Sequence, residues 1–395
     1  MDSPSDHQVF RLNPSDSAVG NCESVRGFEV EPFRPRRGLR GGHAQTIASH
    51  LLTRRDTLPE SERVLVQVET DVQVLCACHW QTDREHALTL IIVHGLEGSS
   101  DSQYVIGTAD KAWAAGMNVV RMNVRNCGGT EKLAATLYHS GMSDDIDRVV
   151  RFFIDRDRLA TVFLVGFSMG GNQVLKLAGE WGERPPAQVI GLTTICPAMD
   201  LGPSADAIHA LENRLYEWRF LVSLRRRMKR KVALFPEKFK VERWWWKSIR
   251  DFDDALTAPA FGFADATDYY DRASSSRVLQ QIRLPSLIIQ AKDDPFIRIE
   301  PSTYKELAAN PCILFYQSAH GGHCGFLGEP QRDERTMQGS GTKARDTRGT
   351  LRDKDDGRWA ERQIIRFSQF CHQALEHARN AASGRASDSD CSING

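Results

Sequence analysis

The chain has 395 residues, of which 41% are hydrophobic, so it can form one large α/β domain with insertions, or two domains. Its 51 basic and 51 acidic residues cancel, which excludes an overall field that would draw it to nucleic acid or an anionic membrane. No stretch approaches the roughly 18 apolar residues of a membrane-spanning helix, and the N-terminus lacks a signal-peptide pattern. We therefore expect a cytoplasmic globular protein that binds no nucleic acid.

The nine cysteines are odd in number and scattered, without paired C-x-x-C spacing. This pattern predicts free thiols in a reducing compartment. Cys76, Cys78 and His79 have the residue types of metal ligands, but the alternation in this segment places both thiols on one face of a strand. We expect these thiols to pack in the core, and we expect neither a metal site nor a cofactor.

The N-terminal part of the chain offers few regular elements. Residues 1–27 are rich in Ser, Asp and Asn, so we predict a disordered segment there. Residues 33–47 are too rich in Pro and Gly for an element and are expected to lie across the domain surface. His43 and Gln45 are candidates for a functional role, but a buried, hydrogen-bonded His43 that pins this segment is the preferred interpretation.

Strands alternate with helices in the middle of the chain. Residues 63–68 and 72–80 predict a two-stranded hairpin. Residues 88–93 form a continuous apolar run, which predicts a strand in a sheet that is covered on both faces. Further strands are predicted at residues 117–123, 161–165, 189–196, 284–291 and 313–317, and predicted helices cover 104–115, 143–155, 172–180 and 359–378. The alternation predicts an α/β fold with a mainly parallel, doubly wound sheet and a site at the strand C-terminal ends.

Two regions interrupt this alternation. Residues 200–282 are too long for a simple crossover and predict a helical lid, whereas the polar residues 329–358 predict a mobile loop. The basic run 225–231 and the tryptophans 244–246 could contact a membrane, but zero net charge favours a solvated helix end and packing within the lid. The Ser-rich tail, 381–395, is expected to be disordered, which leaves a single domain over 28–380.

The most informative motif is G-x-S-x-G, formed by Gly166, Ser168 and Gly170 between a predicted strand and a predicted helix. Glycines two residues before and after a sharp turn remove the side chains that would clash there. Such a turn exposes Ser168 at a helix N-terminus, where negative charge is stabilised. We therefore predict that Ser168 is a nucleophile.

A serine hydroxyl reacts only when a histidine takes its proton and an acid orients that histidine. In α/β sheets with this motif the chain order is Ser, acid, His. The acid should follow a later strand, where Asp293 and Asp294 are adjacent after residues 284–291. Only one of them can face the histidine, so we favour Asp294 and expect Asp293 to cap or solvate the turn.

The histidine should lie on the loop after the last strand. Residues 320–326, HGGHCGF, offer His320 and His323. Two glycines precede His323 and let its side chain turn back over the sheet, so we favour His323 as the base. We expect His320 to bond to backbone.

An oxyanion hole needs two backbone N–H groups aimed at the developing negative charge. Met169, directly after the nucleophile, supplies one candidate N–H group. Leu96, which follows the His94-Gly95 pair after an earlier strand, supplies the other.

Seven motifs in order give the chain a family resemblance. They are GGHAQTI at 41–47, HGLEGSSDSQY at 94–104, NVRNCGGT at 123–130, GFSMGGN at 166–172, FGFADATDYYDRASS at 261–275, AKDDPFI at 291–297 and HGGHCGFLG at 320–328. With them the chain resembles the AB hydrolase 4 family, the YheT-like branch of the α/β-hydrolases. The resemblance implies an α/β-hydrolase fold with a lid and a triad of Ser168, Asp294 and His323. It also implies carboxylic ester hydrolysis, with glycerolipids or phospholipids as substrates of some members.

The resulting hypothesis is a cofactor-independent serine esterase that acts on a lipid-like or small ester through an acyl-enzyme intermediate. Two alternatives remain open. The same triad could transfer the acyl group to an alcohol or amine, or the protein could be a non-catalytic binding protein that retains the fold.

Overall fold

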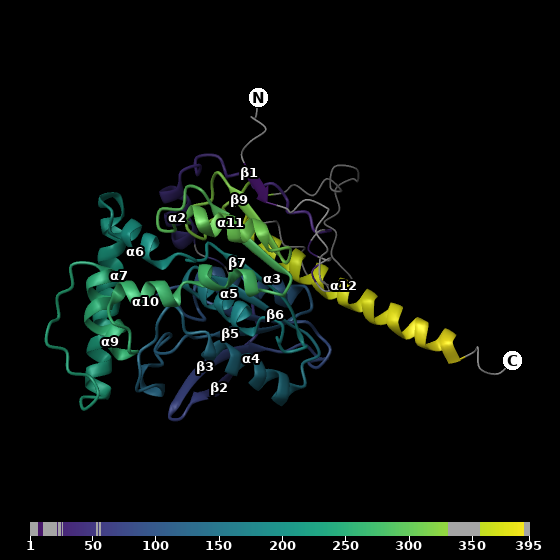
Figure 1. Ribbon diagram of the computed structural model, residues 1–395, viewed down its shortest axis with the longest axis horizontal. Helices are drawn as coiled ribbons and strands as arrows, with labels where there is room; N and C mark the ends of the chain where they lie inside the picture. The colour runs from purple at the N-terminus through teal and green to yellow at the C-terminus, as the bar shows by residue number, and fades with distance from the viewer. Residues whose placement is uncertain are drawn as a thin grey trace.

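The computed structural model describes residues 7–10, 22, 25, 27–52, 54, 57–330 and 356–390, with side chains for all except 7–10 and 382–390. Its centre is a nine-stranded sheet with the order β1-β9-β8-β7-β6-β4-β5-β3-β2 (Figure 1). The strands are β1 (His7–Phe10), β2 (Glu62–Glu69), β3 (Val72–His79), β4 (Thr89–Val93), β5 (Asn118–Met122), β6 (Val162–Phe167), β7 (Val189–Ile195), β8 (Ser286–Ala291) and β9 (Ile313–Ser318).

Helices flank this sheet and form a separate group beside it. The α-helices are α2 (Gly42–Leu51), α3 (Gln103–Ala114), α4 (Asp144–Asp157), α5 (Met169–Trp181), α6 (Leu201–His209), α7 (Arg214–Leu234), α8 (Ile249–Phe252), α9 (Ala258–Ala260), α10 (Ala266–Ala273), α11 (Pro301–Ala309) and α12 (Trp359–Asp390). Shorter helical segments are η2 (Glu131–Leu133), η3 (Leu211–Asn213), η4 (Asp253–Thr257) and η5 (Ser275–Gln281).

The sheet is mainly parallel and doubly wound, as the sequence predicted. Strands β4 to β9 pair in parallel, while β2 and β3 form the predicted hairpin at one edge and β1 pairs antiparallel with β9 at the other. Strand β4 lies between β5 and β6. The chain therefore passes from β4 to β5 on one side, and the strands from β6 onward are added on the other side. In sheets of this kind the crevice at such a reversal, beyond the strand C-terminal ends, is where a site forms.

Both faces of the sheet are covered by helices, which explains why the central strands are continuously apolar. On strand β4, Leu90 and Ile92 belong to the core that includes α3 and α12. Ile91 and Val93 point to the opposite core, which includes α4, α5 and α11. Cys76 and Cys78 are buried in this second core, as their alternation predicted.

The lid is the group of helices inserted between β7 and β8, and in Figure 1 α6, α7, α9 and α10 lie beside the sheet. It has its own apolar cluster, in which Trp246 is buried. Trp245 is exposed. The guanidinium carbon of Arg225 lies over its indole, 4.3 Å from the centroid of the Trp245 ring. The basic run is less solvated than predicted, because Arg227 and Lys231 are buried.

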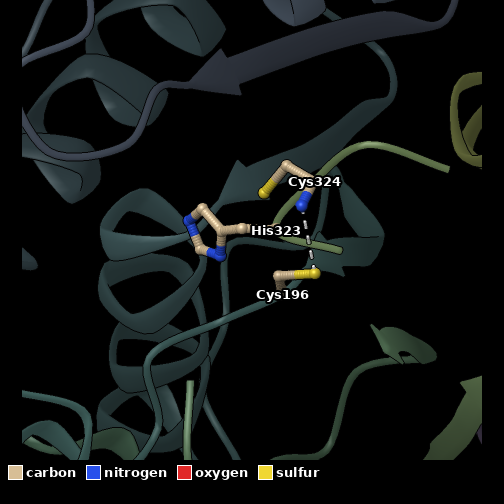
Figure 2. A group of neighbouring side chains, drawn as sticks. All are labelled: Cys196, His323 and Cys324. Atoms are coloured by element: carbon tan, nitrogen blue, oxygen red, sulfur yellow. Dashed lines mark hydrogen bonds between the residues drawn. The ribbon is translucent and has the colours of Figure 1, made fainter. Parts of the chain in front are cut away.

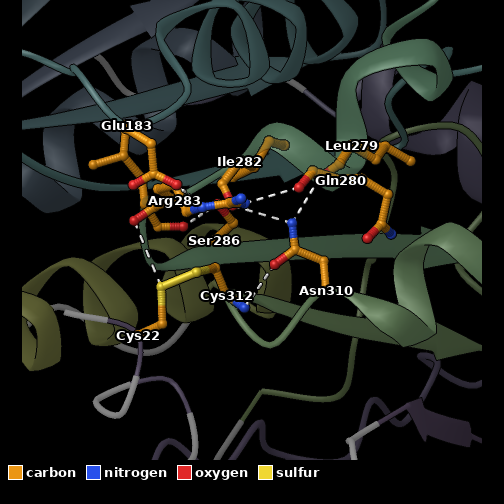
Figure 3. Close-up of a disulfide and its surroundings, with 10 residues drawn as sticks. Cys22, Glu183, Leu279, Gln280, Ile282, Arg283, Ser286, Asn310 and Cys312 are labelled. Carbon is orange, nitrogen blue, oxygen red and sulfur yellow. Dashed lines mark hydrogen bonds and ion pairs between the residues drawn. A yellow bond between two sulfur atoms is a disulfide. The ribbon is translucent and has the colours of Figure 1, made fainter. Parts of the chain in front are cut away.

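The N-terminal segment departs from the prediction of disorder. Strand β1 adds to the free edge of β9, with His7 opposite Ser318. Cys22 forms a disulfide with Cys312, across 290 residues of chain (Figure 3). The prediction that all cysteines are free thiols is therefore wrong, and the argument from cysteines for a reducing compartment falls with it.

Several other predictions differ from the structure, and others concern residues outside the described part of the chain. Residues 33–47 were expected to lack an element, but helix α2 begins at Gly42. The tail was expected to be disordered from residue 381, but α12 continues to Asp390, and residues 391–395 lie outside the described part. Most of the predicted polar loop, residues 331–355, also lies outside it. The domain boundaries and the cytoplasmic location stay predictions.

In the described residues, no helix combines the length and the apolar character that crossing a membrane requires.

Candidate active site

Ser168 lies at the sharp turn between β6 and α5. Its φ of 53° and ψ of −118° are strained for a residue with a side chain. A Cβ on Gly166 would lie 2.6 Å from the Gly170 carbonyl oxygen, and a Cβ on Gly170 would lie 2.5 Å from the His94 carbonyl oxygen. Only glycine permits these approaches, so the turn closes tightly against the end of β4. The Ser168 N–H donates to the Ile195 carbonyl oxygen at 2.9 Å, which fixes the turn on β7.

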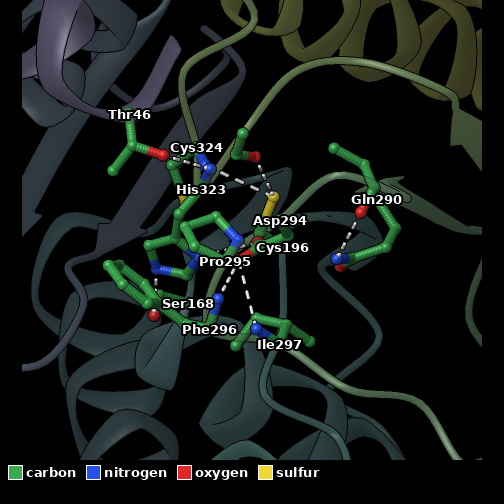
Figure 4. A network of polar contacts seen from close by, with 12 residues as sticks. Thr46, Ser168, Cys196, Gln290, Asp294, Pro295, Phe296, Ile297, His323 and Cys324 are labelled. Atoms are coloured by element: carbon green, nitrogen blue, oxygen red, sulfur yellow. Dashed lines mark hydrogen bonds and ion pairs between the residues drawn. The ribbon is translucent and has the colours of Figure 1, made fainter. Parts of the chain in front are cut away.

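The structure brings Ser168, Asp294 and His323 together at the C-terminal ends of the strands (Figure 4). His323 Nε2 lies 2.8 Å from Ser168 Oγ, and His323 Nδ1 lies 2.8 Å from Asp294 Oδ2. Asp294 Oδ1 accepts hydrogen bonds from the Phe296 N–H at 2.8 Å and the Ile297 N–H at 3.1 Å. The carboxylate is thus fully buried and fixed on both oxygens, and the imidazole is held between acid and hydroxyl.

The electrostatics of this group favour an ionised acid beside a basic histidine. Burial alone would lower the pKa of His323, but the charge of Asp294, the charge of Cys324 and the hydrogen bond to Asp294 together outweigh burial and raise that pKa to about 9. Burial would raise the pKa of Asp294, but the charge of His323 and the hydrogen bonds to its carboxylate lower that pKa below its ordinary value. The pair can therefore stabilise an imidazolium that forms when Ser168 gives up its proton.

Leu96 and Met169, the candidate donors of an oxyanion hole, line the same cavity as Ser168. Met169 is the first residue of α5, so its N–H has no acceptor within the helix. Leu96 follows Gly95, and a Cβ on Gly95 would lie only 3.0 Å from Ser168 Cβ. The Gly95 N–H donates to the Tyr104 hydroxyl at 2.9 Å, which fixes the loop beside the serine.

His94 fixes the same loop from below. It is fully buried, its Nε2 accepts from the Val124 N–H at 3.1 Å, and its Nδ1 lies 2.7 Å from the Gly95 carbonyl oxygen. Since Nε2 is an acceptor, the proton is on Nδ1 and is donated to Gly95. Burial lowers the pKa of His94 to about 4, so this neutral tautomer persists at physiological pH.

The lid contacts this loop directly. Glu97, next to the Leu96 amide, forms a salt bridge with Arg227 and accepts a hydrogen bond from Ser223, both on α7. The Tyr138 hydroxyl donates to Glu97 at 3.1 Å, and the Arg227 guanidinium lies 4.8 Å from the centroid of the Tyr138 ring. The position of the lid helix and the conformation of the loop are therefore coupled.

The loop that carries His323 is held by residues from distant parts of the chain. The His323 N–H donates to Thr46 Oγ1 on α2 at 2.9 Å, and the Gly322 N–H donates to Asp293 Oδ1 at 2.8 Å. Asp293 thus anchors the histidine loop and does not merely cap the turn. His320 Nδ1 lies 3.6 Å from Asp293 Oδ2, so the imidazole of His320 pairs with this carboxylate, contrary to the expected bond to backbone.

Gln45, and not His43, pins the N-terminal segment. Gln45 is fully buried, its Oε1 accepts from the Leu327 N–H at 2.7 Å, and its Nε2 donates to the Leu327 carbonyl oxygen at 3.0 Å. His43 is exposed, and its Nδ1 lies 3.2 Å from the Tyr216 hydroxyl on the lid. The preference for a buried His43 was therefore wrong. Both His43 and Gln45, within the GGHAQTI motif, were candidates from the sequence, but only the fold reveals which of the two side chains points inward.

A cavity of about 110 Å³ opens onto Ser168 and His323 beneath the lid. Most of its lining on the lid side is apolar. These lid residues include Ile208, Phe220, Leu224, Met228, Ile249 and Phe252. An apolar cavity with a few placed polar groups is suited to the hydrocarbon part of a small-molecule ligand.

Comparison with known proteins identifies the family. Residues 89–330 match the model of the alpha/beta hydrolase fold, which covers more than half of the chain. The chain therefore belongs to the α/β-hydrolase family, as the resemblance in its motifs implied.

Individual proteins are similar to this chain to different degrees. The chain is 32% identical over 299 residues to the YheT protein of Escherichia coli (strain K12), whose name marks its esterase activity as provisional; the match covers 75% of this chain and 87% of that protein. It is 26% identical over 312 residues to the medium-chain fatty acid ethyl ester synthase/esterase 2 of Saccharomyces cerevisiae, covering 72% and 62% of the two chains. Among solved structures, the Pyrococcus furiosus esterase Pf2001 matches 88% of this chain and 99% of its own, with 14% identity and a TM-score of 0.48.

Proposed function

We propose that the protein is a serine carboxylic ester hydrolase that acts on a lipid-like ester without a cofactor. The observation that carries this proposal is the chain of two 2.8 Å hydrogen bonds from Asp294 through His323 to Ser168. A binding protein without catalysis has no need of this arrangement at a strained serine. The family and its esterase relatives support the same reaction class.

The proposed mechanism uses each group in one role. His323 Nε2 takes the proton of Ser168 as the alkoxide attacks the ester carbonyl, and Asp294 stabilises the resulting imidazolium. The Leu96 and Met169 amides bind the oxyanion of the tetrahedral intermediate. His323 then protonates the leaving alcohol, and it next removes a proton from the water that hydrolyses the acyl-enzyme.

The lid supports a lipid-like substrate. Its cavity side is apolar, and its outer surface exposes Leu211, Leu215 and Trp218 at 79%, 74% and 63% of their areas. Leu211 lies on η3, and Leu215 and Trp218 lie in the first turns of α7; large exposed apolar side chains close together in the chain are suited to transient contact with a lipid surface during substrate capture. The yeast relative's name also specifies a fatty acyl ester.

The test is hydrolysis of p-nitrophenyl esters of graded acyl length by the wild type and by Ser168→Ala. We expect measurable turnover that favours medium or long acyl chains, and a loss on the order of 10⁶-fold in kcat for the variant. Near-wild-type turnover by folded Ser168→Ala would refute the assigned nucleophile. A preference for acetate over longer chains would refute the lipid-like substrate.

Acyl transfer on the same triad is a second candidate, favoured by the synthase/esterase name of the yeast relative. An alcohol in the site could attack the acyl-enzyme in place of water. Addition of ethanol to the esterase assay tests this candidate, because transfer yields the ethyl ester at the expense of the free acid.

A further inference from the structure

Two cysteine thiols lie beside the catalytic histidine and have no role in the proposed reaction (Figure 2). Cys196 directly follows β7 and is fully buried, while Cys324 directly follows His323 and is partly exposed. The Cys324 N–H donates to Cys196 Sγ at 3.3 Å, so the two residues are in direct contact. The two sulfur atoms and a ring nitrogen of His323 all lie within 4.8 Å of one another.

This spacing is close to that of a metal site. Zn²⁺ binds thiolate sulfur at about 2.3 Å and imidazole nitrogen at about 2.0–2.1 Å in tetrahedral geometry, which places neighbouring ligand atoms roughly 3.4–3.8 Å apart. The observed separations, which reach at most 4.8 Å, therefore need to shrink by up to about 1.4 Å, which side-chain rotations can supply.

Metal binding at this place competes with the triad. His323 Nδ1 is bonded to Asp294 and Nε2 is bonded to Ser168, so both ring nitrogens are already in use. Whichever nitrogen binds the metal, one of these two hydrogen bonds is lost. A bound cation therefore removes either the orientation of the base or its access to the nucleophile.

The chemistry of the three ligands selects the cation. Two sulfurs and one imidazole favour Zn²⁺ and similar thiophilic ions, whereas Mg²⁺ and Ca²⁺ require oxygen ligands. Binding releases the two thiol protons as the two metal–sulfur bonds form.

We propose that Cys196, Cys324 and His323 form an inhibitory Zn²⁺ site that switches off the enzyme reversibly. The inhibition rests on the proposed esterase function, but the binding of metal does not. The two can therefore be measured separately.

Binding is measured with Co²⁺, whose thiolate charge-transfer absorption reports direct coordination by sulfur. The protein is the full chain carrying Ser168→Ala, which prevents turnover. It is kept reduced with a phosphine, because a thiol reductant would itself bind Co²⁺. We expect a charge-transfer band that Zn²⁺ abolishes, and no band when Cys324→Ser or Cys196→Ser is added. The Cys196→Ser hydroxyl retains an acceptor for the Cys324 N–H, so at least this variant should fold.

Inhibition is measured by ester hydrolysis at increasing Zn²⁺, with each protein normalised to its own rate in the presence of a chelator. We expect the inhibition constant of Cys324→Ser to rise at least 10- to 100-fold, since even indirect metal partners contribute about this much affinity. The control is Cys371→Ser. Cys371 Sγ lies near Gly191 on β7, which is five residues, or about 16 Å, from Cys196, so its removal should leave inhibition unchanged.

Two results would overturn the proposal. One is a charge-transfer band that is absent in the Ser168→Ala protein or equally strong after both cysteine substitutions. The other is equal Zn²⁺ inhibition of the wild type and Cys324→Ser, which would place the inhibition on His323 alone or elsewhere. A cysteine-dependent band in the Ser168→Ala protein, together with a wild-type protein that hydrolyses no ester, would instead support the metal site and refute the proposed function.

Discussion

Replacement of Asp294 by Asn tests the electrostatics of the triad. The pKa of His323 is about 9 instead of its ordinary 6.5, which corresponds to about 3 kcal/mol in favour of the imidazolium. Two unit charges about 4 Å apart at an effective dielectric constant of about 20 interact by about 4 kcal/mol, so the carboxylate of Asp294 is sufficient as the cause. The side chain introduced by Asp294→Asn lacks this charge, and its amide group would donate to Nδ1 and impose the wrong tautomer on the imidazole.

The assay is the pH dependence of kcat/KM for a p-nitrophenyl ester. Since His323 must be neutral to accept a proton, wild-type kcat/KM should rise with pH and level off above about 9. Asp294→Asn removes the charge of Asp294 while burial still lowers the pKa of His323, so the apparent pKa should fall below the wild-type value of about 9, and kcat should drop about 10⁴-fold. The matched control is Asp293→Asn, which should lower the rate modestly and keep the wild-type pH profile. A large effect in Asp293→Asn with a small one in Asp294→Asn would refute the assignment of the acid.

Three further changes test the supports of the site. Tyr104→Phe leaves the Gly95 N–H without its acceptor and should lower kcat about tenfold with little change in KM, as steady-state kinetics would reveal; an unchanged kcat would contradict a role in positioning the loop. Gln45→Ala removes buried hydrogen bonds to the histidine loop and should lower the free energy of unfolding by about 2–3 kcal/mol in urea titration, and a smaller loss than about 0.5 kcal/mol would contradict it. Cys22→Ser opens the link to Cys312 and should lower the free energy of unfolding by about 2–4 kcal/mol while kcat/KM at low temperature stays the same; equal stability of both proteins in oxidising buffer would contradict a structural role for the disulfide.

The parallel sheet and the residues of the proposed triad were accessible from the sequence because their signals are local. Apolar runs predict strands, and the glycines around Ser168 are required because a Cβ at Gly166 or Gly170 would lie only 2.5–2.6 Å from a backbone carbonyl oxygen. Asp294 and His323 followed from chain order on a doubly wound sheet, where strand C-terminal ends meet. Each of these inferences needs only a short segment and a known topology.

The parts that could not be predicted depend on contacts between distant segments. Strand β1 exists because β9 offers a free edge, and nothing within residues 7–10 indicates this partner. The hydrogen bond from the His323 N–H to Thr46 spans 277 residues of chain. Thr46 lies on α2, whose Gly-rich start is a poor helix former, so tertiary contacts of this kind are what stabilise the helix. The disulfide of Cys22 likewise depends on a partner 290 residues away. Cysteine counting alone could not distinguish this pair from the thiols in the core.

The central claim is that Ser168 is an activated nucleophile. Its most direct test is reaction of the purified protein with a fluorophosphonate probe, which labels only activated serines, followed by mass spectrometry of the modified peptide. We predict one adduct, on Ser168, that is absent from Ser168→Ala and strongly slowed in Asp294→Asn. Folded wild-type protein that remains unlabelled, or that carries the adduct on another serine, would contradict the account.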